Sequence, residues 1–101
     1  MGNVSAQTQN PEGRIVQLHT ETWDHVLERR PQMADFLEET MRAIELPEHR
    51  EPDVRAGRER YFRRGGPQAW LRVVTEFAGP TDRVVTAFPQ FNDPRHGAPR
   101  R

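Results

Sequence analysis

Three short extended runs, joined by links of about five residues, constrain the fold of this chain more than any other feature of its sequence. The runs cover residues 58–64, 70–77 and 83–88, and the turn residues Gly65-Gly66-Pro67 and Gly79-Pro80 separate them. Links this short join antiparallel neighbours, because a parallel crossover needs a dozen or more residues. The sequence therefore predicts a three-stranded antiparallel meander in the second half of the chain.

The first half has a helical period instead. Residues 14–19 read as a short strand, and residues 21–30 place Trp23, Val26 and Leu27 on one face of a helix. Pro31 suits the first turn of a second helix, which is expected to run to residue 45 before Pro47 ends it and a polar loop follows. One apolar stripe marks this second helix: Met33, Phe36, Leu37, Met41 and Ile44.

These elements predict an α+β fold in the order β-α-α-β-β-β. Two N-terminal helices would pack on one face of a mostly antiparallel four-stranded sheet. We expect one domain over residues 14–91, with the polar segments 1–13 and 92–101 as flexible tails. A domain of this size has one modest core and no room for a large cofactor.

Composition narrows the chemistry. The chain has no Cys, which removes disulfides, thiolate metal sites and thiol catalysis. It has no Gly-rich phosphate loop, no His-Glu-x-x-His and no Gly-x-Ser-x-Gly, and His19 beside His25 is only a weak metal signal. We expect neither metal nor cofactor. The N-terminus resembles no signal peptide and no run is apolar enough for a bilayer, so a cytoplasmic protein without a membrane partner is expected.

The formal net charge of zero conceals an asymmetry. Residues 1–54 hold five Arg against eleven Asp and Glu, a net charge of minus six, and residues 55–101 hold ten Arg against four acids, plus six. Every basic residue is Arg, which suits bidentate contacts with phosphate but also fits a genome bias. An acidic helical half could meet a protein partner while the basic half meets RNA.

The segment 55–72 interleaves six Arg with Tyr61, Phe62 and Trp70 and contains one acid, Glu59. Guanidinium groups neutralise phosphates and aromatic rings stack on unpaired bases, so the pattern favours RNA binding. A solvated sheet face with two core aromatics is the alternative. Because side chains alternate along a strand, one set faces the helices; we expect Phe62 to point inward and Tyr61 with Arg63 to point outward.

Among the histidines, His25 borders the apolar face of the first predicted helix, where partial burial and access would suit proton transfer. The alternative is a surface histidine on a helix. His49 in the predicted loop and His96 in the predicted tail are interpreted as incidental. A base for the ribose 2′-hydroxyl, Arg for the phosphate charge and an acid for the 5′-oxygen are what RNA cleavage without metal requires.

Four short motifs occur in a suggestive order: Trp23-Asp24-His25-Val26-Leu27 followed by Arg30-Pro31, then Arg60-Tyr61-Phe62-Arg63, then Trp70-Leu71-Arg72-Val73-Val74, and finally Val84-Val85-Thr86-Ala87-Phe88. In this order and spacing, residues 15–89 resemble the small phage and bacterial nucleases of the barnase, EndoU, colicin and RelE-like superfamily. The resemblance implies a barnase- or RelE-like fold and metal-independent endoribonuclease activity, often as a toxin, with an antitoxin or immunity protein as the partner.

Carried over by position, the resemblance assigns proton transfer to His25, the phosphate to Arg60 or Arg63, and the orientation of a phosphate oxygen to Thr86. Tyr61 would contact a base or the phosphate, and Glu59 is a spare general base. The remaining candidates for substrate binding are Arg58, Arg64, Trp70 and Arg72.

One departure from the superfamily pattern stands at Arg30, where relatives carry a His before the proline. Arg binds phosphate but does not shuttle protons at neutral pH. Thr86 also has a plainer interpretation as a β-branched residue chosen for packing. Two readings follow: an endoribonuclease that cleaves by attack of the 2′-hydroxyl, or a non-catalytic module that binds RNA or protein on the same fold.

Overall fold

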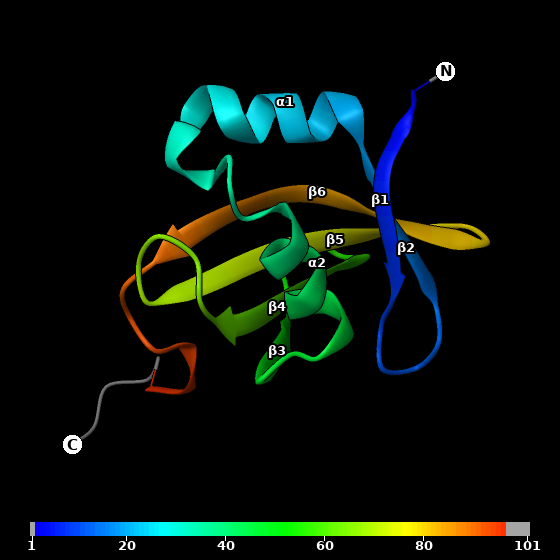
Figure 1. Cartoon of the computed structure of the whole chain (residues 1–101). Coiled ribbons are helices and arrows are strands. Elements are labelled where there is room, and N and C mark those ends of the chain that lie inside the picture. The colour runs from blue at the N-terminus through cyan, green and yellow to red at the C-terminus, as the bar shows by residue number, and fades with distance from the viewer. Residues whose placement is uncertain (1, 97–101) are drawn as a thin grey trace.

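The computed structural model describes residues 2–96, except for the side chain of His96 (Figure 1). Over these residues the strands form one six-stranded sheet in the order β1-β2-β6-β5-β4-β3. All neighbours are antiparallel except β2 and β6, which run parallel over a short stretch. The elements are β1 Val4–Gln9, β2 Ile15–His19, α1 Thr20–Arg29, η1 Pro31–Met33, α2 Leu37–Glu45, β3 His49–Pro52, β4 Arg58–Arg64, β5 Trp70–Ala78, β6 Thr81–Gln90 and η2 Pro94–His96.

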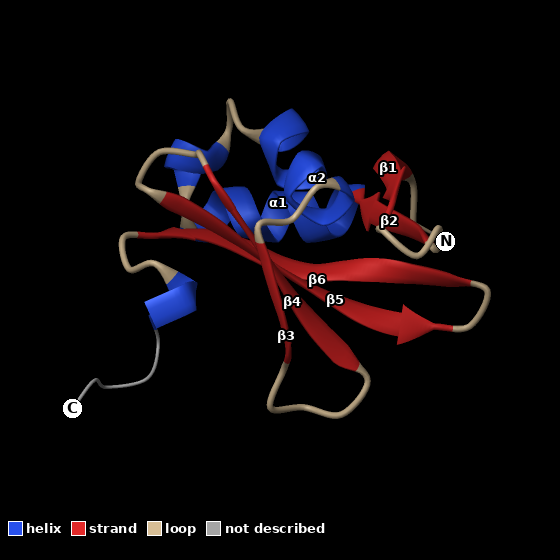
Figure 2. Ribbon diagram, turned by 90° about the horizontal axis from the view of Figure 1, so that it is seen from below, coloured by secondary structure: helices blue, strands red, loops and turns tan. Residues whose placement is uncertain are grey.

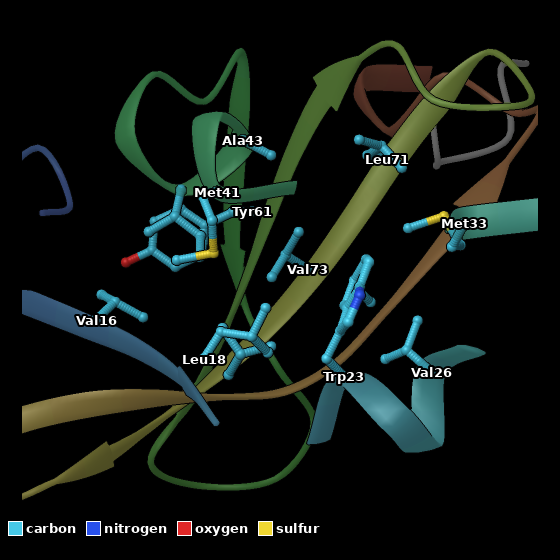
Figure 3. Packing of buried hydrophobic residues seen from close by; sticks show 13 residues of the cluster. Val16, Leu18, Trp23, Val26, Met33, Met41, Ala43, Tyr61, Leu71 and Val73 are labelled. Carbon is cyan, nitrogen blue, oxygen red and sulfur yellow. The ribbon is translucent and has the colours of Figure 1, made fainter. Parts of the chain in front are cut away.

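Both α-helices cover the same face of the sheet (Figure 2). α1 presents Trp23 and Val26, three residues apart, and α2 presents Met41 and Ile44 with the same spacing. These side chains meet the inward residues of the strands in one core, where Figure 3 shows Tyr61 and Val73 of the sheet together with Met41 of α2 and Trp23 of α1. The sheet residues in this core are Val16, Leu18, Tyr61, Leu71, Val73, Val84 and Ala87.

The opposite face of β3–β6 carries no α-helix in the described part of the chain, and we call it the bare face. The short η2 lies at one end of the sheet on this side (Figure 2). Strand alternation places Arg60 and Phe62 of β4 here, because Tyr61 between them faces the core. The expectation that Phe62 points toward the helices and Tyr61 outward is therefore wrong. The phenol is the largest fully buried side chain of the core, and the strand register follows from burying it.

A β-bulge at Val85 decides what β6 offers to the bare face. Thr75 pairs with Val84 and Val74 pairs with Thr86, so Val85 has no partner on β5. Val84 and Ala87 both face the core, and the extra residue between them turns Thr86 outward. Strict alternation from Val84 would have put Thr86 against the helices.

The predicted four-stranded sheet with N-terminal helices is wrong. The chain is α+β with two α-helices, but the sheet has six strands, mixes parallel and antiparallel pairs, and begins with a hairpin ahead of α1. β1 lies within segment 1–13, which was expected to be a tail, and β3 lies where a polar loop was expected. The meander of β4, β5 and β6 is present. Of the tail expected at 92–101, residues 94–96 form η2, and residues 97–101 lie outside the described residues.

The second helical segment is also divided. Pro31 opens the short 3-10 turn η1, and α2 begins only at Leu37. Met33 lies in η1 and is buried there, so the predicted apolar stripe is divided between η1 and α2. In residues 2–96, no helix is long and apolar enough to cross a membrane.

Candidate functional site

One row of side chains crosses the bare face from edge to edge. His49 on β3 stands opposite Phe62 on β4, which stands opposite Arg72 on β5, which stands opposite Phe88 on β6. The His49 and Phe62 rings are 5.5 Å apart between centroids. The Arg72 guanidinium carbon lies 5.8 Å from the Phe62 ring centre and 5.0 Å from that of Phe88. The row therefore holds a guanidinium between two aromatic rings.

Arg30 reaches the same row from the end of α1. Its guanidinium carbon lies 4.9 Å from the Phe88 ring centre, so Arg30 and Arg72 both contact this ring. Trp70 in turn has Arg64 at 5.0 Å and Arg95 at 5.2 Å. The aromatic rings thus form a floor that guanidinium groups cover, and Phe62 and Trp70 are both buried.

A second row beside the first contains Glu51, Arg60, Val74 and Thr86. Glu51 Oε1 lies 3.0 Å from His49 Nε2, and Arg60 Nη1 donates to Glu51 Oε2 at 2.9 Å. Arg60 Nε also donates to Asp53 Oδ1 at 2.7 Å. The bond from His49, and next those from Arg60, hold the pKa of the Glu51 carboxyl below its ordinary value, so this group is ionised at neutral pH.

Arg72 differs from the other arginines of this face. Its Nε is buried without a hydrogen-bond partner among the described residues, whereas Arg58, Arg60 and Arg64 each pair with a carboxylate. Burial first, and then the charge of Arg60, lowers the pKa of the Arg72 guanidinium. The group stays positive at neutral pH, because an arginine pKa lies far above neutral and the charges of Asp53 and Glu51 offset part of the lowering. These two carboxylates act on the cation from nearby, but its Nε has no hydrogen-bond partner among the described residues.

Glu51 and Arg72 line the same pocket, which has a volume of about 370 Å³ and which we call the Arg72 pocket. Phe62 forms part of it from β4, and the segment between β6 and η2 closes one side. The pocket lining is Glu51, Phe62, Arg72, Gln90, Asn92, Asp93 and Pro94. A carboxylate, a guanidinium and a nearby imidazole therefore converge at one opening on the bare face.

The structure does not bring His25 to this place. His25 lies on α1, which packs on the other face of the sheet, and its side chain is 79% exposed with Glu28 at 3.6 Å. Arg63 and Glu59 share the core-facing side of β4, where Arg63 Nη1 donates to the Leu46 carbonyl at 2.6 Å. Arg60 and Thr86 are in the same row of the bare face, with Val74 of β5 between them.

The residues predicted to bind substrate are also divided between the two faces. Tyr61 is in the core, where its hydroxyl accepts hydrogen bonds from Asn10 and Arg50. The other four lie on the bare face: Arg58 paired with Glu76, Arg64 paired with Glu48, Trp70 beneath two guanidinium groups, and Arg72 in its pocket.

Sequence reasoning missed His49 and Glu51 as members of the site. The signal was available, because residues two apart on a strand project from the same face. It was lost because residues 47–53 were taken for a loop. Arg30 was noticed only as a departure from a motif, and nothing in its sequence neighbours places it on Phe88.

No group of three or more His, Cys, Asp or Glu side chains that could hold a metal ion occurs among residues 2–96. Comparison of the chain with models of protein families, with curated proteins and with solved structures found no match. The site is therefore interpreted from its own chemistry.

Proposed function

We propose that this chain is a metal-independent endoribonuclease that cleaves RNA in the Arg72 pocket. The observation that carries the proposal is the shared opening of an ionised carboxylate, Glu51, and a guanidinium, Arg72, whose buried Nε has no hydrogen-bond partner in the described chain. His49 lies within hydrogen-bond distance of that carboxylate. These are the three kinds of group that RNA cleavage without a metal ion needs.

In the proposed reaction, Glu51 accepts the proton of a ribose 2′-hydroxyl and the 2′-oxygen attacks the adjacent phosphorus. The bond from phosphorus to the 5′-oxygen breaks, and protonated His49 supplies the proton that completes the new 5′-hydroxyl. Arg72 stabilises the negative charge that grows on the other phosphate oxygens. Arg60, fixed by Asp53, keeps Glu51 in place. The products are a 2′,3′-cyclic phosphate and a 5′-hydroxyl.

The test is incubation of the purified protein with single-stranded RNA in excess chelator, followed by analysis of the new ends. We expect cleavage to persist and the ends to be 2′,3′-cyclic phosphates. Glu51→Gln keeps the shape of the side chain and one acceptor oxygen but removes the base, so the rate should fall about a hundredfold or more. His25→Ala separates this assignment from the one made by motif position, and should leave the rate unchanged. Intact RNA, or a loss confined to the His25 variant, would overturn the proposal.

A second candidate is a module that binds RNA without cleaving it. Arg30 favours this reading, because a cation without a transferable proton stands on Phe88 where the resembling nucleases carry a His. The same experiment decides between the two functions. RNA that is retained in a binding assay and remains intact, with affinity reduced by Arg72→Met, supports the binding module.

The cytoplasm, where RNA substrates are abundant, is the location that we propose, together with a toxin-like role and an antitoxin or immunity protein as partner. A toxin of this kind arrests growth when it is expressed in a bacterium. We expect arrest with the natural chain and normal growth with Glu51→Gln. Equal growth with both chains would exclude the toxin role while leaving the enzymatic proposal to the cleavage assay.

A further inference from the structure

A second pocket opens on the other side of the sheet, away from Arg72. It lies where the turn of the β1–β2 hairpin approaches β3–β6, and its volume is about 380 Å³. We call it the hairpin pocket. It is lined by Asn10, Glu12, Arg14, Arg50, Gly57, Arg58, Glu59, Tyr61, Thr75, Phe77 and Asp82. The proposed cleavage reaction does not use it, although one of its lining residues, Tyr61, also belongs to the core.

The walls of the hairpin pocket are fixed by hydrogen bonds. Asn10 is buried; its Oδ1 accepts from the backbone N–H groups of Glu12 and Arg14, and its Nδ2 donates to the Tyr61 hydroxyl at 3.0 Å. Arg14 Nη2 donates to Asp82 Oδ1 at 2.7 Å across the pocket rim. The pocket is therefore built into the fold, with the hairpin turn on one side and the sheet on the other.

Three polar groups in this pocket have unused hydrogen-bonding capacity. The Tyr61 hydroxyl, in a side chain only 1% exposed, accepts two hydrogen bonds but has no acceptor for its own proton among the described residues. The Thr75 hydroxyl, in a side chain 2% exposed, has no hydrogen-bond partner there. Glu59, opposite Thr75 on β4, has only Arg50 at 3.4 Å. Among the described residues, the buried polar atom of this pocket that lacks a hydrogen-bond partner is Arg50 Nε, and the other three groups can still bond to whatever fills the pocket.

The unused groups have a definite polarity. Burial raises the pKa of the Tyr61 phenol, so it keeps its proton and can donate at neutral pH. Tyr61 and Thr75 can thus both donate to a ligand oxygen, and the Glu59 carboxylate can accept from a ligand N–H. Phe77 adds an aromatic surface at the rim; its side chain is 61% exposed, and the Arg14 guanidinium lies 4.5 Å from its ring centre.

We infer that the hairpin pocket binds a nucleobase that carries a carbonyl oxygen beside an N–H group, as guanine and uracil do. The carbonyl oxygen accepts from Tyr61 and Thr75, the N–H donates to Glu59, and the ring stacks on Phe77. The volume is sufficient for one nucleoside. Adenine lacks the carbonyl and fits poorly. An amide side chain could use the same hydrogen bonds but would leave Phe77 without a stacking partner.

Free nucleosides test this inference, because they carry no phosphate to draw them to Arg72. The four ribonucleosides are titrated into the natural protein while backbone amide shifts are followed by NMR. We expect guanosine or uridine to move the signals of Asn10, Tyr61, Thr75 and Phe77, and adenosine to bind at least tenfold more weakly. This experiment is independent of cleavage, so it can succeed or fail whatever the chain does to RNA.

Two variants and one control sharpen the result. Thr75→Val keeps the shape of the side chain and removes a hydroxyl that has no partner in the described chain, so the fold should be unaffected while binding weakens about tenfold. Phe77→Ala should also weaken binding. Phe91→Ala, at an equally exposed phenylalanine outside the pocket (73% exposed), should not. No binding by any nucleoside at millimolar concentration, or shifts confined to the Arg72 pocket, would overturn the inference.

Discussion

Arg72 is the residue that most clearly indicates a functional role for the bare face. Its guanidinium lies between Phe62 and Phe88, its Nε has no hydrogen-bond partner in the described chain, and Arg60 lies close enough to lower its pKa. The buried Nε without a partner and the like charge of Arg60 cost stability, and the contacts with the two rings offset only part of that cost. A residue retained for packing alone would carry no such cost, so function is the better explanation for a charge at this position.

Arg72→Met tests whether Arg72 lowers the stability of the fold and serves the function. Methionine keeps an unbranched side chain between the two rings and removes the buried unpartnered nitrogen, so we expect the free energy of unfolding to stay within about 1 kcal/mol or to rise. RNA cleavage should fall about a hundredfold or more, because the charge that stabilises the transition state is gone. Urea denaturation and a cleavage assay measure the two effects. A destabilised variant with undiminished cleavage would show that Arg72 is structural.

At the scale of elements, α1 and the meander followed from local patterns, whereas β1 and β3 did not. The helix α1 and the strands β4–β6 contain enough buried side chains to show their period in the sequence. β1 has no buried side chain and β3 has none either, so both are strands because of backbone pairing with β2 and β4. Backbone pairing alone leaves no period of buried side chains in the sequence. The sequence did not predict His49 and Glu51 as site residues for the same reason, because both lie on β3.

Asn10 anchors the β1–β2 hairpin to the rest of the sheet. Its side chain makes three hydrogen bonds, two within the turn and one to Tyr61. Asn10→Ala should lower the free energy of unfolding by about 1–3 kcal/mol and speed hydrogen exchange in β1 and β2 ahead of the meander. Gln9→Ala, at the exposed last residue of β1 and next to Asn10, is the matched control and should change stability by less than about 0.5 kcal/mol. Uniform exchange across the sheet would mean that the hairpin is not a separate unit.

At the scale of the whole molecule, folding removes much of the charge asymmetry of the sequence. Glu48, Glu51 and Asp53 come from the acidic half, and they pair with Arg64 and Arg60 of the basic half across β3 and β4. Glu76 pairs with both Arg58 and Arg83. These ion pairs form a network on the bare face. Arg72 differs from the other arginines there, because none of the ion pairs among the described residues includes it.

This network of ion pairs makes the stability of the fold depend on pH in the acidic range. The hydrogen bond from Arg60 holds the pKa of the Asp53 carboxyl below its ordinary value of 3.8, and the pKa values of Glu51 and Glu76 are held below 4.5. A carboxyl whose pKa is lower in the folded state stabilises the fold above its unfolded pKa, and this stabilisation is lost as the pH falls through the folded value. The melting temperature should therefore be nearly constant from pH 7 to about pH 5 and fall steadily below it.

Asp53→Asn tests the contribution of one carboxylate in this network of ion pairs. Asparagine cannot ionise, so the variant should melt lower than the natural chain at pH 7, and the two melting curves should approach each other as the pH falls toward 3. Asp35→Asn is the matched control, since Asp35 is exposed and forms no ion pair within residues 2–96, and its melting curve should follow that of the natural chain. Curves for Asp53→Asn and the natural chain that stay parallel down to pH 3 would mean that the carboxylate of Asp53 contributes packing and not charge. In that case the ion pairs of the bare face would serve to space its arginines rather than to stabilise the sheet.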